Sequence, residues 1–372
     1  MSSEGSFKKF FKDVQEGSAK PFQEVYLDST EKEKAELKLV ELKKQEAYAQ
    51  NTYRIFESAL VREDVGKLDE KIDEYGKGEF NFFFSKFVDG VILFKRARMP
   101  KAIGKYLRNI VFDYYAKQYK GAPGVDIGTG LDEKIPLDRS YLSTYLSFIA
   151  YWLANSLYIE REFGESARDE LVKFVTDMAG FYAESGVIFE QAQTRFHRGG
   201  RDSKSSEFLH LIDKNKNMFP SLHVEVVAHT YSRILDIIGK YSEDEKNYQF
   251  VKHHLLERGG KILDSTLFLK QHSFRDISAG LVAISARDNN FTRERAQNLV
   301  DSMFLDDKAK ENLSIGVISE IKSRIMMLYD QLMTEIQVDP DKDYTQVLVD
   351  YIKSIEQETQ QMAAESALQN KK

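Results

Sequence analysis

The sequence predicts an all-α protein, and three observations favour this fold class. Glycine and proline, which interrupt helices most often, number only 21 and 6 among 372 residues. Apolar residues recur at three- and four-residue steps over most of the chain, which is the helical period. Alternation with a period of two, bounded by turn residues, is almost absent. A hydrophobic content of 42% is sufficient for a large core.

Composition also excludes several classes of function. The chain carries 53 basic and 59 acidic side chains, so no global positive field attracts nucleic acid or an anionic membrane. The absence of cysteine excludes disulfides, thiolate catalysis, zinc–thiolate sites and iron–sulfur clusters. Lysines interrupt every short hydrophobic cluster near the N-terminus, which is atypical of a signal peptide. We therefore expect a cytoplasmic protein that binds no nucleic acid.

Residues 1–78 are expected to form an N-terminal helical arm. A Thr30-x-x-Glu33 capping box opens a long helix there. Its apolar residues follow heptad spacing: Leu39, Leu42, Ala49, Tyr53, Phe56 and Leu60. Packing of this stripe on the chain's own core is the favoured interpretation, and formation of a homodimer through it is the alternative.

Residues 79–336 are expected to form the helical core. Its first part, Phe80 to Arg98, mixes aromatic and basic residues and is interpreted as an amphipathic helix with a solvated basic edge. The glycine-rich segment 121–130 is interpreted as a connector, because it lacks the preceding strand and the glycine spacing of a phosphate-binding loop. Ser140–Ile159 has no charge over twenty residues. That length could span a bilayer, but its serines and tyrosines favour a buried helix.

The remaining elements follow from helical periodicity. Helices are expected over Tyr141–Glu160, Ser166–Glu184, Phe219–Lys240, Glu243–Arg258, Lys261–Ala286, Thr292–Phe304 and Lys308–Ile336. Residues 337–372 are expected to form a last amphipathic helix and a frayed or partner-binding tail.

The histidines give the first indication of chemistry. All seven lie between His197 and His272. Histidine titrates near neutrality and serves as acid, base or nucleophile, although most histidines are ordinary core or surface residues. His253 and Glu257 lie one helical turn apart and could share a metal ion. Because no third or fourth ligand can be named, we predict no metal site.

The first motif is Phe219-Pro220-Ser221-Leu222-His223. A proline suited to the first turn of a helix stands beside a hydroxyl and an imidazole, where an apolar helical period begins. Free backbone N–H groups and the helix dipole at such an end attract anions. The motif therefore predicts a phosphate site that includes Ser221 and His223.

The second motif runs from Ser265 to Gly280 and contains His272 and Asp276. On a continuous helix these two residues, four positions apart, would share a face. The carboxylate would then accept from one ring nitrogen and leave the other nucleophilic. An ordinary pair on a helix surface is the alternative interpretation of this spacing.

Together the motifs resemble the type 2 phosphatidic acid phosphatase superfamily, which includes bacterial acid phosphatases, vanadium haloperoxidases and inositol-phosphorylceramide-synthase-like transferases. The family pattern reads Lys-x6-Arg-Pro, then Pro-Ser-Gly-His, then Ser-Arg-x5-His-x3-Asp. Pro220-Ser221-Leu222-His223 is similar to the second part, and Ser265-Thr266-x5-His272-x3-Asp276 to the third. Leucine for glycine and threonine for arginine are nearest the transferase branch.

The first part of the pattern departs most from the family. Gln191-x6-Arg198-Gly199 keeps its register but replaces lysine by glutamine and proline by glycine. Arg195 or Arg201 could replace the lost cation, since guanidinium groups bind phosphate oxygens in pairs. The resemblance covers residues 191–280.

The resemblance implies a helical bundle of the phosphatase and haloperoxidase kind, and a phosphatase or phosphotransferase that works through a phosphohistidine without cofactor or metal. It assigns nucleophilic attack to His272, orientation of that ring to Asp276, and proton transfer to His223. The phosphate ligands would come from these residues: Ser221, Arg198, Arg195, Arg201, Gln191 and Thr266.

The substrate implied is a phosphate ester. A lipid phosphate is one candidate, and peripheral membrane contact would accompany it. Because the pattern lacks its lysine and one arginine, a catalytically degenerate member is the alternative. Such a protein would act as a helical scaffold or regulatory protein and bind partners through its terminal helices.

Overall fold

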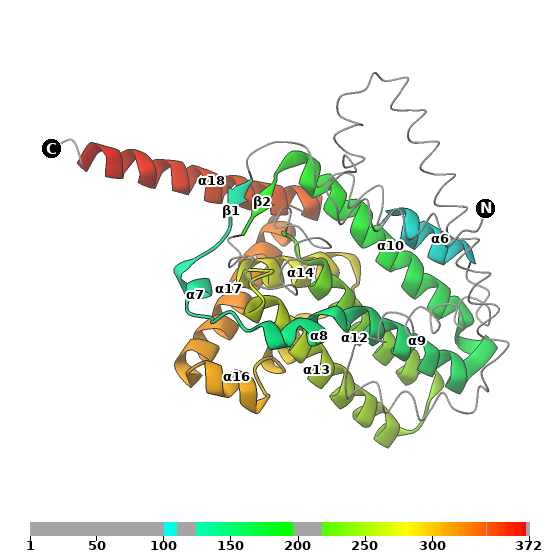
Figure 1. Ribbon diagram of the computed structural model, residues 1–372. Coiled ribbons are helices and arrows are strands. Elements are labelled where there is room, and N and C mark those ends of the chain that lie inside the picture. Colours follow the sequence, from blue (N-terminus) through cyan, green and yellow to red (C-terminus); the bar gives the residue numbers. More distant parts are fainter. Residues whose placement is uncertain (1–99, 110–123, 197–217, 340, 370–372) are drawn as a thin grey trace, which may run out of the picture. The chain divides into compact units, whose positions relative to one another are not determined.

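The computed structural model describes residues 100–109, 124–196, 218–339 and 341–369. The chain divides into two units between Lys67 and Leu68, and every described residue belongs to the second. Across the described part, 79% of the residues are helical and 2% lie in strands, which confirms the all-α prediction (Figure 1). The expected N-terminal arm, 1–78, and the stretch from Phe80 to Arg98 lie outside the described residues.

The described helices follow one another with short connections. They are α6 (Pro100–Asn109), α7 (Gly130–Glu133), α8 (Leu142–Leu146), α9 (Phe148–Phe163), α10 (Arg168–Gln191), α12 (Leu222–Tyr241), α13 (Glu245–Phe268), α14 (Phe274–Arg287), α15 (Arg293–Asp301), α16 (Asp307–Asn312), α17 (Ile315–Val338) and α18 (Tyr344–Gln369). Two 3-10 turns, η4 (Arg139–Tyr141) and η5 (Gly164–Ala167), precede α8 and α10.

Helix α12 lies at the centre of the packing. It contacts α9, α10, α13 and α14, and its side chains are buried around nearly its whole circumference. A helix that is apolar on all sides requires neighbours on all sides. The residues before its first turn, which carry the first motif, are therefore held in the interior.

Short polar side chains set the starts of several helices. Asp244, Thr292, Asp306 and Ser314 each accept a hydrogen bond from a backbone amide in the first turn of α13, α15, α16 and α17 respectively. Such N-caps satisfy amides that have no partner inside the helix, and each contributes about 1 kcal/mol.

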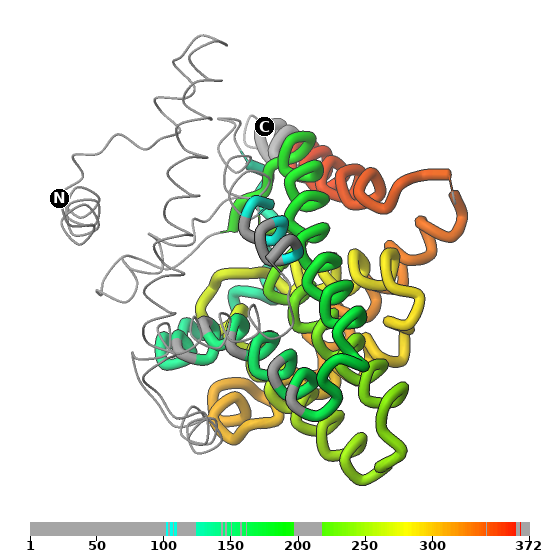
Figure 2. Tube along the Cα trace, turned by 90° about the vertical axis from the view of Figure 1, so that its right-hand side faces the viewer, coloured from blue at the N-terminus to red at the C-terminus, as the bar shows by residue number. Residues whose placement is uncertain are grey.

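The C-terminal helix α18 packs on the body of this unit. It contacts α10, α14 and α17, and Figure 2 shows its first turns, in red, beside α10, in green. The Tyr344 hydroxyl donates to Glu184 of α10, and Arg287 of α14 pairs with the same carboxylate at 3.2 Å. One acidic group thus joins three helices.

The uncharged stretch Ser140–Ile159 forms two helices where one was expected. Helix α8 ends at Leu146, and α9 begins after Ser147, whose hydroxyl donates to the carbonyl of Thr144 at 2.6 Å. A serine that bonds back to the preceding turn competes with the helical hydrogen bond there. No helix among those described is both long and apolar enough to cross a membrane.

The helices of the second motif also differ from expectation. Helix α13 continues through Gly259 and Gly260, where a boundary was predicted. These glycines serve close packing, since a Cβ on Gly260 would lie 2.2 Å from the carbonyl oxygen of Ser302. The chain instead leaves the helix after Phe268, so the helix predicted over Lys261–Ala286 is interrupted before α14.

A short parallel strand pair was not predicted. β1 (Val125–Asp126) pairs with β2 (Thr194–Arg195), with Val125 opposite Thr194. Gly124 permits this approach, because a Cβ there would meet the backbone of Thr194 at 2.9 Å. Part of the segment interpreted as a connector is therefore attached to the end of α10, and β1 also lies against α18 (Figure 1).

Candidate active site

The start of α12 presents an unused hydroxyl in the protein interior. Ser221 is the N-cap of α12, but its side chain makes no capping bond. The residue is 0% exposed, and its Oγ has no hydrogen-bond partner within the described part of the chain. Its amide donates to the carbonyl of Asp276 at 3.2 Å, which joins the first motif to the second.

The segment between α13 and α14 carries His272. The carbonyl of Thr266 accepts the amides of both Gln271, at 2.9 Å, and His272, at 3.1 Å. Lys270 adopts a left-handed conformation with φ of 55°, which turns the chain sharply without a glycine. His272 thus precedes Ser273, the N-cap of α14.

His272 and Asp276 are in contact, but not in the way the helical spacing predicted. His272 lies before the helix, and Asp276 occupies the third position inside it. The His272 Nδ1 and Asp276 Oδ2 are 3.2 Å apart. The same carboxylate oxygen accepts the Ser273 amide at 2.8 Å as part of a capping box. The helix cap therefore orients the carboxylate toward the imidazole.

His223 lies beside His272, with ring centroids 5.7 Å apart. The rings of Tyr145 and Phe148 each lie 4.2 Å from that of His223, centroid to centroid. His272 is only 5% exposed, whereas His223 is half-buried. The two motifs, distant in sequence, are brought together with His223 on the more accessible side.

A glycine permits this approach of α12 to α14. A Cβ on Gly280 would lie 2.8 Å from the Cβ of Val224 and 2.9 Å from the carbonyl oxygen of Ser221. Real Cβ atoms do not approach so closely, so the two helices would separate around a larger residue. Gly280 therefore determines the distance between the two motifs.

Asp132 is a residue of this region that sequence reasoning missed. Its Oδ2 accepts the Ser273 hydroxyl at 2.9 Å, and its Oδ1 accepts the Phe274 amide at 3.1 Å. Burial raises the pKa of this carboxyl, against several hydrogen bonds that lower it. The pattern Thr129-x-x-Asp132 signals a local helix cap, but nothing in it indicates contact with the second motif.

The predicted phosphate ligands are less complete. The hydroxyl of Thr266 donates to the carbonyl of Leu263 at 2.7 Å. Gln191 is exposed at the end of α10, and Arg195 is exposed on β2, 4.0 Å from Asp126. Within the described residues no printed contact joins Arg195 to either motif histidine. Arg198 and Arg201 lie outside the described part.

Other histidines have structural surroundings. His229 is fully buried, stacks on Phe174 with centroids 4.9 Å apart, and bonds the Phe174 carbonyl through Nε2 at 3.1 Å. Burial lowers its pKa to about 3. Glu257 pairs with Lys261 at 2.7 Å. Among the described residues no group of three or more metal-ligating side chains is assembled.

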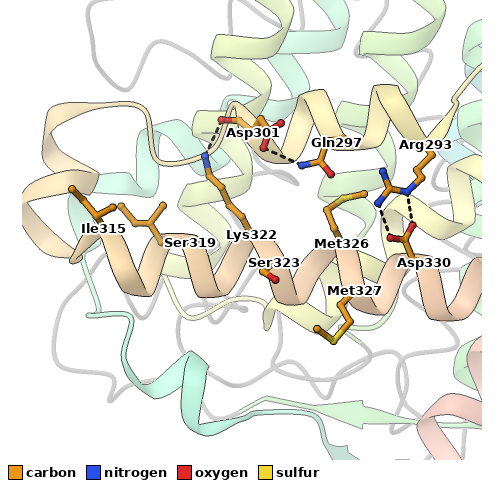
Figure 3. A pocket seen from close by; sticks show the side chains of 11 residues that line it. Arg293, Gln297, Asp301, Ile315, Ser319, Lys322, Ser323, Met326, Met327 and Asp330 are labelled. Atoms are coloured by element: carbon orange, nitrogen blue, oxygen red, sulfur yellow. Dashed lines mark hydrogen bonds and ion pairs between the residues drawn. The ribbon is translucent and has the colours of Figure 1, made fainter.

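A groove of about 700 Å³ lies between α15 and α17 (Figure 3). Its charged groups are paired with one another: Arg293 makes two 2.7 Å bonds to Asp330, and Lys322 donates to the Asp301 carbonyl at 2.9 Å. Neither motif contributes to its walls. The motif histidines therefore remain the better candidate for chemistry.

Comparisons of the chain with family models, curated proteins and solved structures find no match.

Proposed function

We propose that this chain is a phosphatase or phosphotransferase of the type 2 phosphatidic acid phosphatase kind, which acts on a phosphate ester through a phosphohistidine. The observation that carries the proposal is the meeting of the two motifs, with 5.7 Å between the ring centroids of His223 and His272. An in-line displacement at phosphorus requires a nucleophile and an acid on opposite sides of one group.

His272 is the proposed nucleophile. A proton on Nδ1, donated to Asp276, leaves the lone pair of Nε2 available for attack on phosphorus. The Asp276 carboxylate then stabilises the positive charge that develops on the ring when the N–P bond forms. This arrangement is the same division of roles as a base and its orienting carboxylate in other enzymes.

His223 is the proposed acid. As the P–O bond of the ester breaks, it gives its proton to the leaving oxygen, and the alcohol departs. Neutral His223 then takes a proton from water or from an acceptor alcohol, whose oxygen attacks the phosphohistidine. The products are phosphate, or a new ester, and regenerated His272.

The start of α12 is the proposed phosphate site. The helix is 20 residues long, its N-cap side chain is not used for capping, and Ser221 Oγ is buried without a partner among the described residues. Backbone N–H groups at such an end attract an oxyanion. We assign the remaining positive charge to Arg198, with Arg195 and Arg201 as alternatives.

Vanadate binding tests this proposal, because vanadate adopts the five-coordinate geometry of the phosphoryl transition state. Wild type is expected to bind vanadate and to release phosphate from a panel of lipid phosphates, soluble monoesters and diesters. His272→Ala is expected to lose both properties, and His223→Ala to slow release of the alcohol. A Thr176→Ala variant, altered on the surface of α10, serves as a folded control.

Equal vanadate affinity in wild type and His272→Ala would contradict the proposal. So would absence of binding to a fully folded wild type. Either result would favour the alternative, a non-catalytic scaffold that retains the motifs for packing.

A further inference from the structure

The segment that ends in α7 holds the start of α14 from outside the motifs. Asp132 is 3% exposed and accepts hydrogen bonds from four groups. Two come from Thr129 and fix the carboxylate in its own turn. The other two come from Ser273 and Phe274, which directly follow His272.

A second contact fixes the same two segments. Lys270 Nζ donates to the carbonyl oxygen of Asp132 at 2.5 Å. Lys270 is the residue whose left-handed backbone turns the chain toward His272. The turn and the helix start on either side of His272 are therefore both attached to one residue.

We infer that Asp132 is a positioning residue for His272: by holding Ser273 and Phe274 it fixes the cap of α14, and thereby the bond between Asp276 and the imidazole. The inference rests on the proposed function for its catalytic meaning. The connection runs from Asp132 to the Ser273 hydroxyl, from the Ser273 amide to Asp276 Oδ2, and from that oxygen to His272 Nδ1.

The chemistry of the carboxylate explains why an aspartate is needed. Both of its oxygens accept, and charge-assisted bonds to a buried carboxylate are stronger than neutral ones. An asparagine of the same size would present an NH₂ group to one set of these donors. Asp132→Asn should therefore release one side of the cap while the shape of the side chain is retained.

Asp264 offers a matched control. It is also a buried aspartate whose pKa is raised by burial, and its Oδ2 accepts a backbone amide, that of Phe304, at 2.8 Å. Phe304 precedes α16 and lies outside both motifs. Asp264→Asn should lose stability through the same kind of broken cap without a bond to the His272 segment.

The test combines imidazole NMR with vanadate titration. His272 signals are assigned in ¹⁵N-histidine protein by their loss in His272→Ala. In Asp132→Asn we expect a shifted Nδ1 signal, a changed tautomer ratio and at least tenfold weaker vanadate binding. Asp264→Asn should keep both at wild-type values. If Asp132→Asn does not fold, Thr129→Val removes one bond to the same carboxylate and should give a smaller shift.

The two possible failures are distinguishable. An unchanged His272 spectrum in Asp132→Asn, or an equal change in Asp264→Asn, would overturn the positioning role. A shifted His272 spectrum in Asp132→Asn only, in a protein that never binds vanadate, would support the positioning role and overturn the phosphate function.

Discussion

The hydroxyl of Ser221 is the single group that best separates a binding role from a packing role. A buried polar group without a partner reduces stability, because its hydration is lost and not replaced. Evolution toward packing alone would favour alanine at this position. Its retention beside His223 and His272 is accounted for if an oxyanion supplies the missing partner.

Ser221→Ala should therefore act in opposite directions on stability and binding. We expect the free energy of unfolding to stay constant or rise by up to about 1 kcal/mol, since no protein bond is broken. Vanadate affinity should fall about tenfold, which corresponds to about 1.4 kcal/mol. Urea unfolding and vanadate titration of the same samples measure both quantities.

Ser156→Ala is the control for that substitution. Ser156 is also fully buried, but its hydroxyl donates to the Trp152 carbonyl at 2.8 Å. Its loss should cost about 0.5–1.5 kcal/mol and leave vanadate affinity unchanged. A clear loss of stability in Ser221→Ala would show that the hydroxyl already has a structural partner.

At the scale of elements, the distance between α12 and α14 decides whether the two motifs meet. Gly280→Ala should destabilise the protein by about 1–3 kcal/mol, because its Cβ would overlap Val224 and the carbonyl of Ser221. The separated helices should also weaken vanadate binding. Thermal unfolding and titration report the two effects.

Gly239→Ala provides the matched comparison on α12. A Cβ there would meet only a ring carbon of Tyr248, at an ordinary 3.7 Å. Because alanine favours helix, this variant should gain about 0.5–1 kcal/mol and bind vanadate like wild type. Similar behaviour of the two glycine variants would refute the role given to Gly280.

The sequence predicted the elements better than their boundaries. Helical periodicity located the segments of α10, α12 and α17 because each buries a regular apolar face. It missed the break at Lys270, since no glycine or proline marks that turn, and it placed a false boundary at Gly259. The contact between His272 and Asp276 was predicted from a helical spacing, yet a capping box forms it. Asp132 was beyond reach, because side-chain contacts between distant segments leave no local pattern.

At the scale of the whole molecule, the buried histidine His229 links stability to pH. Burial lowers its pKa to about 3 in the folded state, against about 6.5 when unfolded. Between these values the unfolded chain binds the extra proton, so stability falls as the pH is lowered from about 6.5. The contribution reaches about 1.4 kcal/mol per pH unit.

His229→Gln should remove this component. Glutamine can still donate to the carbonyl of Phe174 but does not titrate. Urea unfolding at several values between pH 4 and pH 7 should give a flatter dependence for the variant than for wild type, even where the variant is less stable. Parallel curves would show that His229 does not govern the acid sensitivity.

The bond between Ser273 and Asp132 joins residues 141 positions apart in the chain. Closing a loop of that length costs chain entropy before any contact in the site is gained, and such contacts slow folding. The helices need only local hydrogen bonds and nearby apolar partners to form. Acquisition of helical content and completion of the site are therefore separate kinetic events, and the second depends on a segment that contains neither motif.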